Sequence, residues 1–240
     1  MKFDLSKVKL SDNDIKRGLV LPKEPSEELA EFLGILTGDG YVNFYPYQYK
    51  YLLEIAGDSR LDKDYLTKYT KHLVYKLFNL ESSYSYKKGQ NTMNLRLISK
   101  GLVNYLSKIG FKRGKKEQIG VPRWILKNNE YMKGFVKGLA DTDFSIHRIR
   151  KNYPRISIAC KSKILIKTLF IYLKDNDFML TNFYKEIHID KREYNNSVCY
   201  RVVLNGHNNF RKWMKTIGFR NPRHLKKVVE MGPVEFESTR

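Results

Sequence analysis

Cysteine and long apolar runs are what this chain of 240 residues has least of. Its two cysteines, Cys160 and Cys199, form no CxxC pair and no zinc-ligand spacing, so we expect no structural zinc and a reducing compartment. The first residues, MKFD, contain no apolar segment of a signal peptide. No apolar run approaches the roughly 20 residues that a membrane span needs. The sequence therefore predicts a soluble, intracellular protein with no membrane partner.

Acidic residues are also scarce. The chain has 45 Lys+Arg against 25 Asp+Glu, a formal net charge of +20. Such an excess favours a polyanionic partner, and nucleic acid is the commonest one. A basic ribosomal protein or a membrane-surface protein would share this charge, so charge alone leaves these classes open.

Three short patterns occur in the same order in both halves of the chain. LGILTGDG at residues 33–40 is similar to VKGLADTDF at residues 136–144, with aspartates Asp39 and Asp143 at matched positions. GDSR answers CKSK, and KIGF answers TIGF, all at an offset of about 100 residues. The sequence therefore predicts a tandem duplication.

This duplication divides the chain into four parts. We expect residues 1–24 to form an N-terminal arm and residues 25–120 and 121–229 to form the two repeats. The tail, residues 230–240, fits neither repeat and is expected to be flexible. Whether the arm packs on the protein or touches a partner is left open by the sequence.

Each repeat shows the same coarse order of elements. Apolar periodicity predicts a helix, two strands, an amphipathic helix, two further strands and a last helix ending in Ile-Gly-Phe. The fold class is thus α+β: two αββαββα repeats related by a pseudo-twofold axis, each an antiparallel sheet with helices on one face. The predicted helices include 26–38, 61–78, 129–142 and 163–175, and the predicted strands include 41–45, 51–56, 93–97, 145–150, 155–159 and 183–189.

The other face of each sheet is then free for a partner. A twisted β-ribbon fits the major groove of DNA, where Arg, Lys, Asn and Gln side chains read base edges. An ordinary solvated face is the alternative, and the charge excess favours DNA. The candidate DNA contacts are Asn94, Arg96, Arg148, Arg150, Lys185, His188, Arg201 and Arg223.

The two opening helices carry small residues four apart. Glycine inside a helix costs ~1 kcal/mol relative to alanine, whereas small residues at this spacing let two helix backbones approach closely. We therefore expect the two helices to pack together and hold the repeats; tolerated glycines without a partner are the alternative. The small residues are Ala30, Gly34 and Gly38 in the first helix and Gly134, Gly138 and Thr142 in the second.

Parallel packing of these helices would bring Asp39 and Asp143 together at their C-terminal ends. Two carboxylates there would face the negative ends of two helix dipoles and each other, which divalent cations would relieve. Mg²⁺ prefers oxygen ligands, and metal ions bridging a phosphate activate water for hydrolysis. Each aspartate alone is also a common turn residue, so the prediction depends on the pair.

These motifs resemble the LAGLIDADG homing endonucleases in their single-chain, two-motif form, over roughly residues 26–228. The resemblance implies a monomer whose two saddle-shaped sheets sit in the major groove of a long, nearly asymmetric duplex site. It implies cleavage of both strands with short 3′ overhangs, with Asp39 and Asp143 as catalytic metal ligands. Gly38 and Thr142 would add main-chain contacts near the metals. The expected ion is Mg²⁺, with Mn²⁺ substituting and Ca²⁺ binding without supporting cleavage.

The family often places a basic residue after the last helix of each repeat. In the stretch FKRGKK we favour Lys115, then Lys116, as catalytic, while Arg223 and Lys226 are the weaker candidates in the second repeat. A phosphate contact or a solvated charge is the alternative for each. Phe144 departs from the family, because it stands where the motif normally has glycine. If the turn needs a positive φ, phenylalanine is disfavoured there, so we expect a shifted end of the second motif and slower cleavage of one strand.

The main alternative is a nucleic-acid-binding protein that does not cleave. A maturase that assists splicing of intron RNA, or a repressor, would keep the charge, the sheets and the paired helices. A basic ribosome-associated protein would explain the charge but not the glycine pairs.

Overall fold

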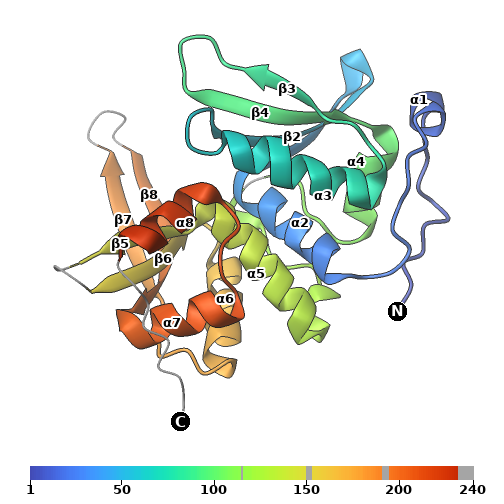
Figure 1. Cartoon of the computed structure of the whole chain (residues 1–240). Helices are drawn as coiled ribbons and strands as arrows, with labels where there is room; N and C mark the ends of the chain where they lie inside the picture. Colours follow the sequence, from blue (N-terminus) through green and yellow to red (C-terminus); the bar gives the residue numbers. More distant parts are fainter. Residues whose placement is uncertain (115, 150–152, 191–194, 232–240) are drawn as a thin grey trace.

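The computed structural model describes residues 1–114, 116–149, 153–190 and 195–231 (Figure 1). The tail that was expected to be flexible therefore lies almost entirely outside the described residues. The helices are α1 (Asp12–Lys16), α2 (Glu27–Asp39), α3 (Lys71–Phe78), α4 (Lys100–Lys108), α5 (Asn129–Asp143), α6 (Lys163–Asp175), α7 (Gly206–Thr216) and α8 (Pro222–Glu230). The strands are β1 (Gly40–Tyr45), β2 (Lys50–Asp58), β3 (Ser83–Tyr86), β4 (Thr92–Ile98), β5 (Ser145–Arg148), β6 (Pro154–Cys160), β7 (Tyr184–Asp190) and β8 (Asn195–Asn205).

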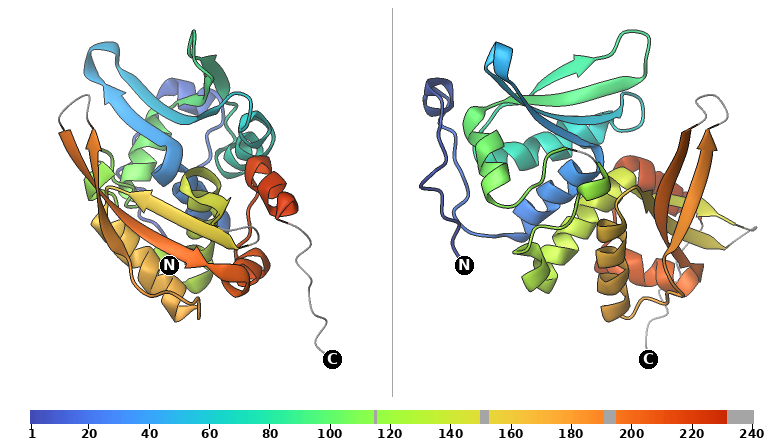
Figure 2. Two further views of the ribbon diagram at one scale, coloured as in Figure 1. Left: turned by 90° about the vertical axis from the view of Figure 1, so that its left-hand side faces the viewer. Right: turned by 180° about the vertical axis from the view of Figure 1, so that it is seen from behind.

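The strands form two antiparallel four-stranded sheets with one topology. Their orders, β1-β2-β4-β3 and β5-β6-β8-β7, are the same when each repeat is counted from its own first strand. Helices cover one face of each sheet, and α2 and α5 lie side by side at the centre between them (Figures 1 and 2). The predicted α+β class and the αββαββα order are confirmed.

Two departures from the predicted elements are local. The helix expected over residues 61–78 begins as a wider π-helical turn over Tyr65–Thr70 and continues as α3. Helix α8 was not predicted as an element. It begins with Asn221 as its N-cap and Pro222 in its first turn, a common start for a helix.

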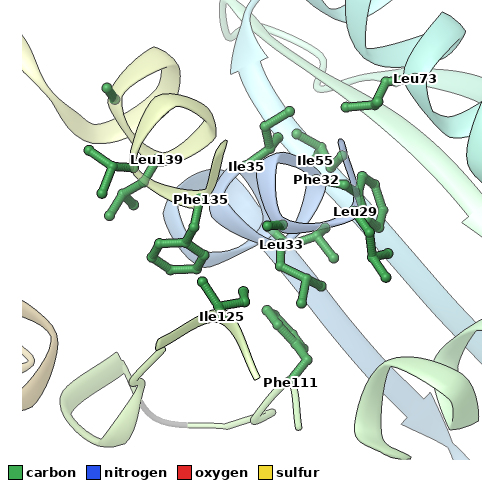
Figure 3. Close-up of a cluster of buried hydrophobic side chains, with 14 of the residues drawn as sticks. Leu29, Phe32, Leu33, Ile35, Ile55, Leu73, Phe111, Ile125, Phe135 and Leu139 are labelled. Carbon is green, nitrogen blue, oxygen red and sulfur yellow. The ribbon is translucent and has the colours of Figure 1, made fainter. Parts of the chain in front are cut away.

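The contact between α2 and α5 confirms the prediction made from their small residues. A Cβ atom added to Gly34 would lie 2.1 Å from the carbonyl oxygen of Phe135, and one added to Gly138 would lie 2.0 Å from that of Glu31. The two backbones therefore touch directly. Figure 3 shows Phe135 and Leu139 of α5 packed beside α2, within one core shared by both repeats.

The N-terminal arm packs on the first repeat. The side chains of Leu10 and Leu19 cover Gly101 of α4 so closely that a Cβ there would lie 2.4 and 2.6 Å from them. The buried carboxylate of Asp14 accepts the Gly101 N–H at 2.9 Å and so caps the start of α4. The arm is thus a structural part of this half of the molecule.

None of the helices in the described ranges combines the length and the apolar character needed to cross a membrane.

The helix contact makes a testable prediction for Gly138→Ala. In an exposed helix this change would stabilise by about 1 kcal/mol, but here the methyl group would overlap the Glu31 carbonyl oxygen. We expect the free energy of unfolding, measured in urea, to fall by about 3 kcal/mol. The matched control is Gly120→Ala, whose Cβ would lie 3.5 Å from its nearest neighbour, on Ile164. A Gly138→Ala protein as stable as the Gly120→Ala protein would contradict the close contact.

Candidate functional site

The ends of α2 and α5 form the centre of the candidate site. Asp39 is the last residue of α2, and Asp143 is the last residue of α5. A Cβ on Gly38 would lie 2.1 Å from the Thr142 hydroxyl oxygen and 3.3 Å from the carboxyl carbon of Asp143. The structure thus brings together all four residues that were predicted to surround the metal ions.

The two motifs leave their helices with the same backbone conformation. Gly40 has φ −84° and ψ 147°, and Phe144 has φ −80° and ψ 152°. Neither is left-handed, so the expected shift at the end of the second motif is wrong: Phe144 adopts its conformation there without a positive φ. The Phe144 side chain is buried, with its ring centroid 5.2 Å from that of Trp213, and it fills the core of the second repeat.

The chemistry of the donors at this place fits a hard cation with few protein ligands. Two carboxylates stand at two helix C-termini, where carbonyl dipoles also favour positive charge. Across the described residues, no group of three or more His, Cys, Asp or Glu side chains gathers to hold a metal ion by itself. Two carboxylates suit a hard divalent cation that keeps several of its waters.

Arg223 binds the end of α5. Its guanidinium donates to the Thr142 carbonyl oxygen at 2.6 Å and to the Asp141 carbonyl oxygen at 3.3 Å, and it pairs with the Asp62 carboxylate at 3.1 Å. A cation that satisfies the last carbonyls of a helix also complements its dipole. Predicted as a DNA contact, Arg223 instead joins the second motif to the first repeat, and it holds the carbonyl of Thr142 that was expected near a metal.

Arg223 belongs to a polar network, the inter-repeat clasp, in which Arg220 and Arg223 bind four buried residues, Glu31, Asp62, Asp141 and Asn221. The Asp141 carboxylate accepts the N–H groups of Arg220 at 2.8 Å and Asn221 at 2.9 Å. The Asn221 amide donates to Asp62 at 2.8 Å, and the Arg220 guanidinium donates to Glu31 at 3.0 Å. The clasp therefore fastens the segment after α7 to both central helices.

The clasp was missed at the sequence level, although Asp141 stands inside the quoted second motif. Its counterpart in the first motif is Thr37, whose hydroxyl donates to the Leu33 carbonyl within α2. An acid in the apolar part of one motif only was the available signal. Burial raises the pKa of Asp141 to about 6, and the N–H groups of Asn221 and Arg220 limit that rise.

The outer face of each sheet, defined as the face away from its helices, holds several predicted DNA contacts. Alternation with the buried Leu95 and Leu97 places Asn94 and Arg96 on the outer face of the first sheet. Arg96 pairs there with Glu54 at 2.7 Å. Arg201, on the outer face of the second sheet, donates two bonds of 2.8 Å to Glu186. A carboxylate thus neutralises each of these two guanidinium groups, and Glu186 also orients that of Arg201.

Two other predicted contacts lie on the opposite face. Lys185 alternates with Glu186 and so points to the helix side, and Arg148 shares the face of the buried Ile146. Their neighbours His147 and Arg155 pair across β5 and β6 on the outer face instead, and Arg155 donates to Asn205 at 2.8 Å. Because side chains alternate between the two faces of a strand, the apolar Ile146 and Ile156 could have placed His147 and Arg155 on the outer face from the sequence.

Four predicted residues are described only in part or not at all. Lys115 and Arg150 lie outside the described residues. For Lys116, which opens a 3-10 turn, and for His188 in β7, the backbone is described.

A groove of about 950 Å³ begins beside the end of α2. It runs from Gly40 and Tyr41 to the loop after α4, where Lys112 and Arg113 line it. The loop proposed to carry the catalytic lysine therefore does bring positive charge beside the first motif.

Comparison with solved structures relates the whole arrangement to known proteins. I-DmoI in complex with DNA and Ca superposes with a TM-score of 0.56 at 22% identity, covering 85% of this chain and 97% of that one. The N-terminal LAGLIDADG domain of DUF199/WhiA gives 0.51 at 12% identity, covering 87% and 89%. At these identities the likeness shows the fold: a two-domain LAGLIDADG fold.

Comparison with curated sequences finds weaker relatives, and no known protein-family model matches. The chain is 25% identical over 206 residues to the replication factor C small subunit of Methanocaldococcus jannaschii. It is 27% identical over 209 residues to tRNA-splicing ligase RtcB of Pyrococcus abyssi. It is also 27% identical over 214 residues to glutamine–fructose-6-phosphate aminotransferase of Methanocaldococcus jannaschii. It matches 10%, 22% and 18% of these proteins' lengths, and the matches cover 86%, 80% and 86% of this chain.

The buried His224 beside the clasp makes a pH prediction. Burial, with the charges of Arg223 and Lys227, lowers its pKa to about 3, below the ordinary value of 6.5. Below pH 6.5 the His224 imidazole becomes protonated in the unfolded chain but stays neutral in the folded protein, so the free energy of unfolding falls as the pH drops. Between pH 7 and 5 this loss is about 2 kcal/mol.

Urea unfolding at the two pH values would measure it. We expect His224→Gln to lose about 2 kcal/mol less than the parent protein over this interval. The control, His207→Gln, changes an exposed histidine on α7 and should keep the parent's pH dependence. Equal pH dependence in all three proteins would contradict the buried, neutral state of His224.

Proposed function

We propose that this chain is a LAGLIDADG-type endonuclease that cuts both strands of double-stranded DNA at a specific site. The observation that carries the proposal is the direct contact of α2 and α5, which brings Asp39 and Asp143 to one place. The likeness to I-DmoI, which has been solved with DNA and Mn and with DNA and Ca, supports both the substrate and a divalent metal.

The chain's own residues have distinct parts in the proposed reaction. Asp39 and Asp143 would hold the metal ions, whose chemistry is to polarise the scissile phosphate and activate water. Arg223 would keep the end of α5 in place, and Lys112 and Arg113 would add positive charge beside the first motif. Two acids related by the pseudo-twofold axis would each serve one strand, and we propose that the cuts leave short 3′ overhangs. We propose Mg²⁺ as the working ion and a monomer as the working form.

The outer faces would bind a long, nearly asymmetric duplex site in its major groove. Asn94, Arg96, His147, Arg155 and Arg201 are the proposed contacts there. Because the sheets differ in these side chains, the two half-sites would differ in sequence.

The curated relatives have unrelated activities, which supports a function of the shared stretch that differs from the activities for which those proteins are named. A replication factor, a tRNA-splicing ligase and an aminotransferase differ in chemistry, yet each contains a similar stretch of about the length of this chain. We infer that the shared stretch is a module whose function is independent of those activities.

A second candidate is a nucleic-acid-binding protein that does not cleave, with intron RNA as a partner. The observation that favours it is the bond from Arg223 to the Thr142 carbonyl, which occupies an oxygen expected to face a metal ion. Tight RNA binding without nicking of either DNA strand would support this candidate over the first.

Cleavage assays with Asp39→Asn and Asp143→Asn would test the proposal. The substrate is the protein's own genomic locus without the inserted reading frame, incubated with Mg²⁺ and end-labelled on each strand. We expect each change to slow cleavage more than about 100-fold on at least one strand, because a metal-binding charge is lost. Asp175→Asn is the matched control, since Asp175 also ends a helix but lies in α6. Double-strand cleavage by the Asp39→Asn, Asp143→Asn double variant would refute the mechanism.

The Arg223→Ala variant tests whether Arg223 holds the C-terminal end of α5 in position for cleavage. The change leaves Asp62 and two helix carbonyls without this donor, so the free energy of unfolding should fall by about 2 kcal/mol. Cleavage should slow on one strand more than on the other, because the change acts at Asp143. Arg220→Ala is the control, since it removes a clasp cation that binds Glu31 instead. The same loss on both strands in both variants would show that Arg223 acts on stability alone.

A further inference from the structure

The N-terminal arm and the β1–β2 hairpin enclose a pocket that the proposed catalytic site does not use. It has a volume of about 570 Å³ and lies where α1, the tip of the hairpin and the start of α4 meet. Figure 2 shows α1 standing beside this hairpin, at the end of the first sheet that is far from the second repeat. Lys16 and Arg17 line it from the arm, Tyr49 and Tyr51 from the hairpin, and Lys100 from α4.

The walls of the arm pocket are held in place by buried contacts. The Arg17 guanidinium pairs with the buried Asp14 at 3.0 Å and donates to the Ile98 carbonyl at 2.8 Å. Asp14 in turn caps α4 through Gly101, as described above. The arm is therefore fixed to the end of β4, so the residues that line the pocket are held in place by the folded structure.

The charge of the pocket is positive. Lys16, Arg17 and Lys100 line it, and the one nearby carboxylate, the buried Asp14, pairs with Arg17, so the two lysines give the pocket its net positive charge. A site with several cations and one shielded anion attracts a polyanion.

The hairpin adds exposed aromatic rings to these cations. Tyr49 is 86% exposed, and its neighbour Tyr47 is completely exposed. Tyr49 also has a left-handed backbone, with φ 47°, where glycine or asparagine would be less costly. Exposed aromatic rings beside cations are typical of surfaces that bind nucleic acid, where cations contact phosphates and rings pack on sugars or bases.

We propose that the arm pocket binds the phosphodiester backbone of duplex DNA that runs beyond the outer face of the first sheet. The inference rests on the proposed function for the choice of DNA as the polyanion. The pocket adjoins Ile98, which pairs with Leu52 on that outer face and is half exposed, so the two surfaces are continuous. The arm thereby lengthens the proposed DNA contact on one side of the molecule, and among the described residues no comparable arm precedes the second repeat.

Salt-dependent binding tests this proposal without knowledge of the target sequence. The probe is a fluorescein-labelled random-sequence duplex, and the variant is Lys16→Ala with Lys100→Ala. The affinity falls as salt rises, and each lost phosphate contact makes the slope of log affinity against log salt shallower by about 0.9. For the double variant we expect a slope shallower by about 2 and binding about tenfold weaker at 0.1 M salt. The control is Lys167→Ala with Lys174→Ala, two exposed lysines of α6.

A photo-cross-link adds a measurement that does not depend on affinity. We expect p-benzoylphenylalanine in place of Tyr49 to cross-link the duplex, and the same residue in place of Tyr75 on α3 not to do so. Both tyrosines are exposed.

The outcomes separate the two proposals. A parent protein that shows no salt-dependent duplex binding and no cleavage of its own locus overturns the proposed function. A parent protein that binds and cleaves, with an unchanged slope in the arm variant and no cross-link at position 49, overturns the arm pocket alone. Cross-linking of polyglutamate but not of DNA at position 49 would assign the pocket to an acidic protein and also overturn the proposal.

Discussion

The contact between the backbones of α2 and α5 is the constraint on which the rest of the molecule depends. Gly34 and Gly138 leave no room for a methyl group between the helices, so the helix axes are fixed by the main chain. Because the helices run parallel, their C-terminal ends meet, and Asp39 and Asp143 follow. The geometry of the candidate site is thus set by core packing and not by loops, which are the more mobile parts of proteins.

That geometry carries an electrostatic cost, and the clasp offsets part of it. Two helix C-termini that end in carboxylates place negative charge in one region, and Glu31, Asp62 and Asp141 lie buried nearby. Arg220 and Arg223 enter this region from the segment after α7 and bind carboxylates and carbonyls of both repeats. The same two arginines therefore neutralise the region and join the repeats, so the site and the inter-repeat contact are coupled.

Local patterns predicted much of this structure, and tertiary contacts account for what they missed. Small residues at helical spacing were enough to pair α2 with α5, because that contact involves regular helices and the main chain. The effect of Phe144 was misjudged, because the backbone conformation after a helix depends on the strand that follows. Lys185 and Arg148 were assigned without a fixed register, and a shift of one residue exchanges the faces of a strand. The clasp joins residues far apart in sequence, which no local pattern shows.

Because the outer-face arginines Arg96 and Arg201 are paired with carboxylates, they are better suited to recognising bases than to attracting phosphates. Arg96 and Arg201 are each paired with a carboxylate, so in the proposed DNA complex they would offer N–H groups to base edges while adding little net charge. Phosphate attraction, which dominates affinity for DNA, must then come from cations that are not neutralised in this way. Such cations include Arg155 on the outer face of the second sheet, which donates to the neutral Asn205, and Lys112, Arg113, Lys16 and Lys100 beside the sheets. In the proposed DNA complex, the carboxylate-paired arginines would therefore serve mainly specificity, and the other cations would serve mainly affinity.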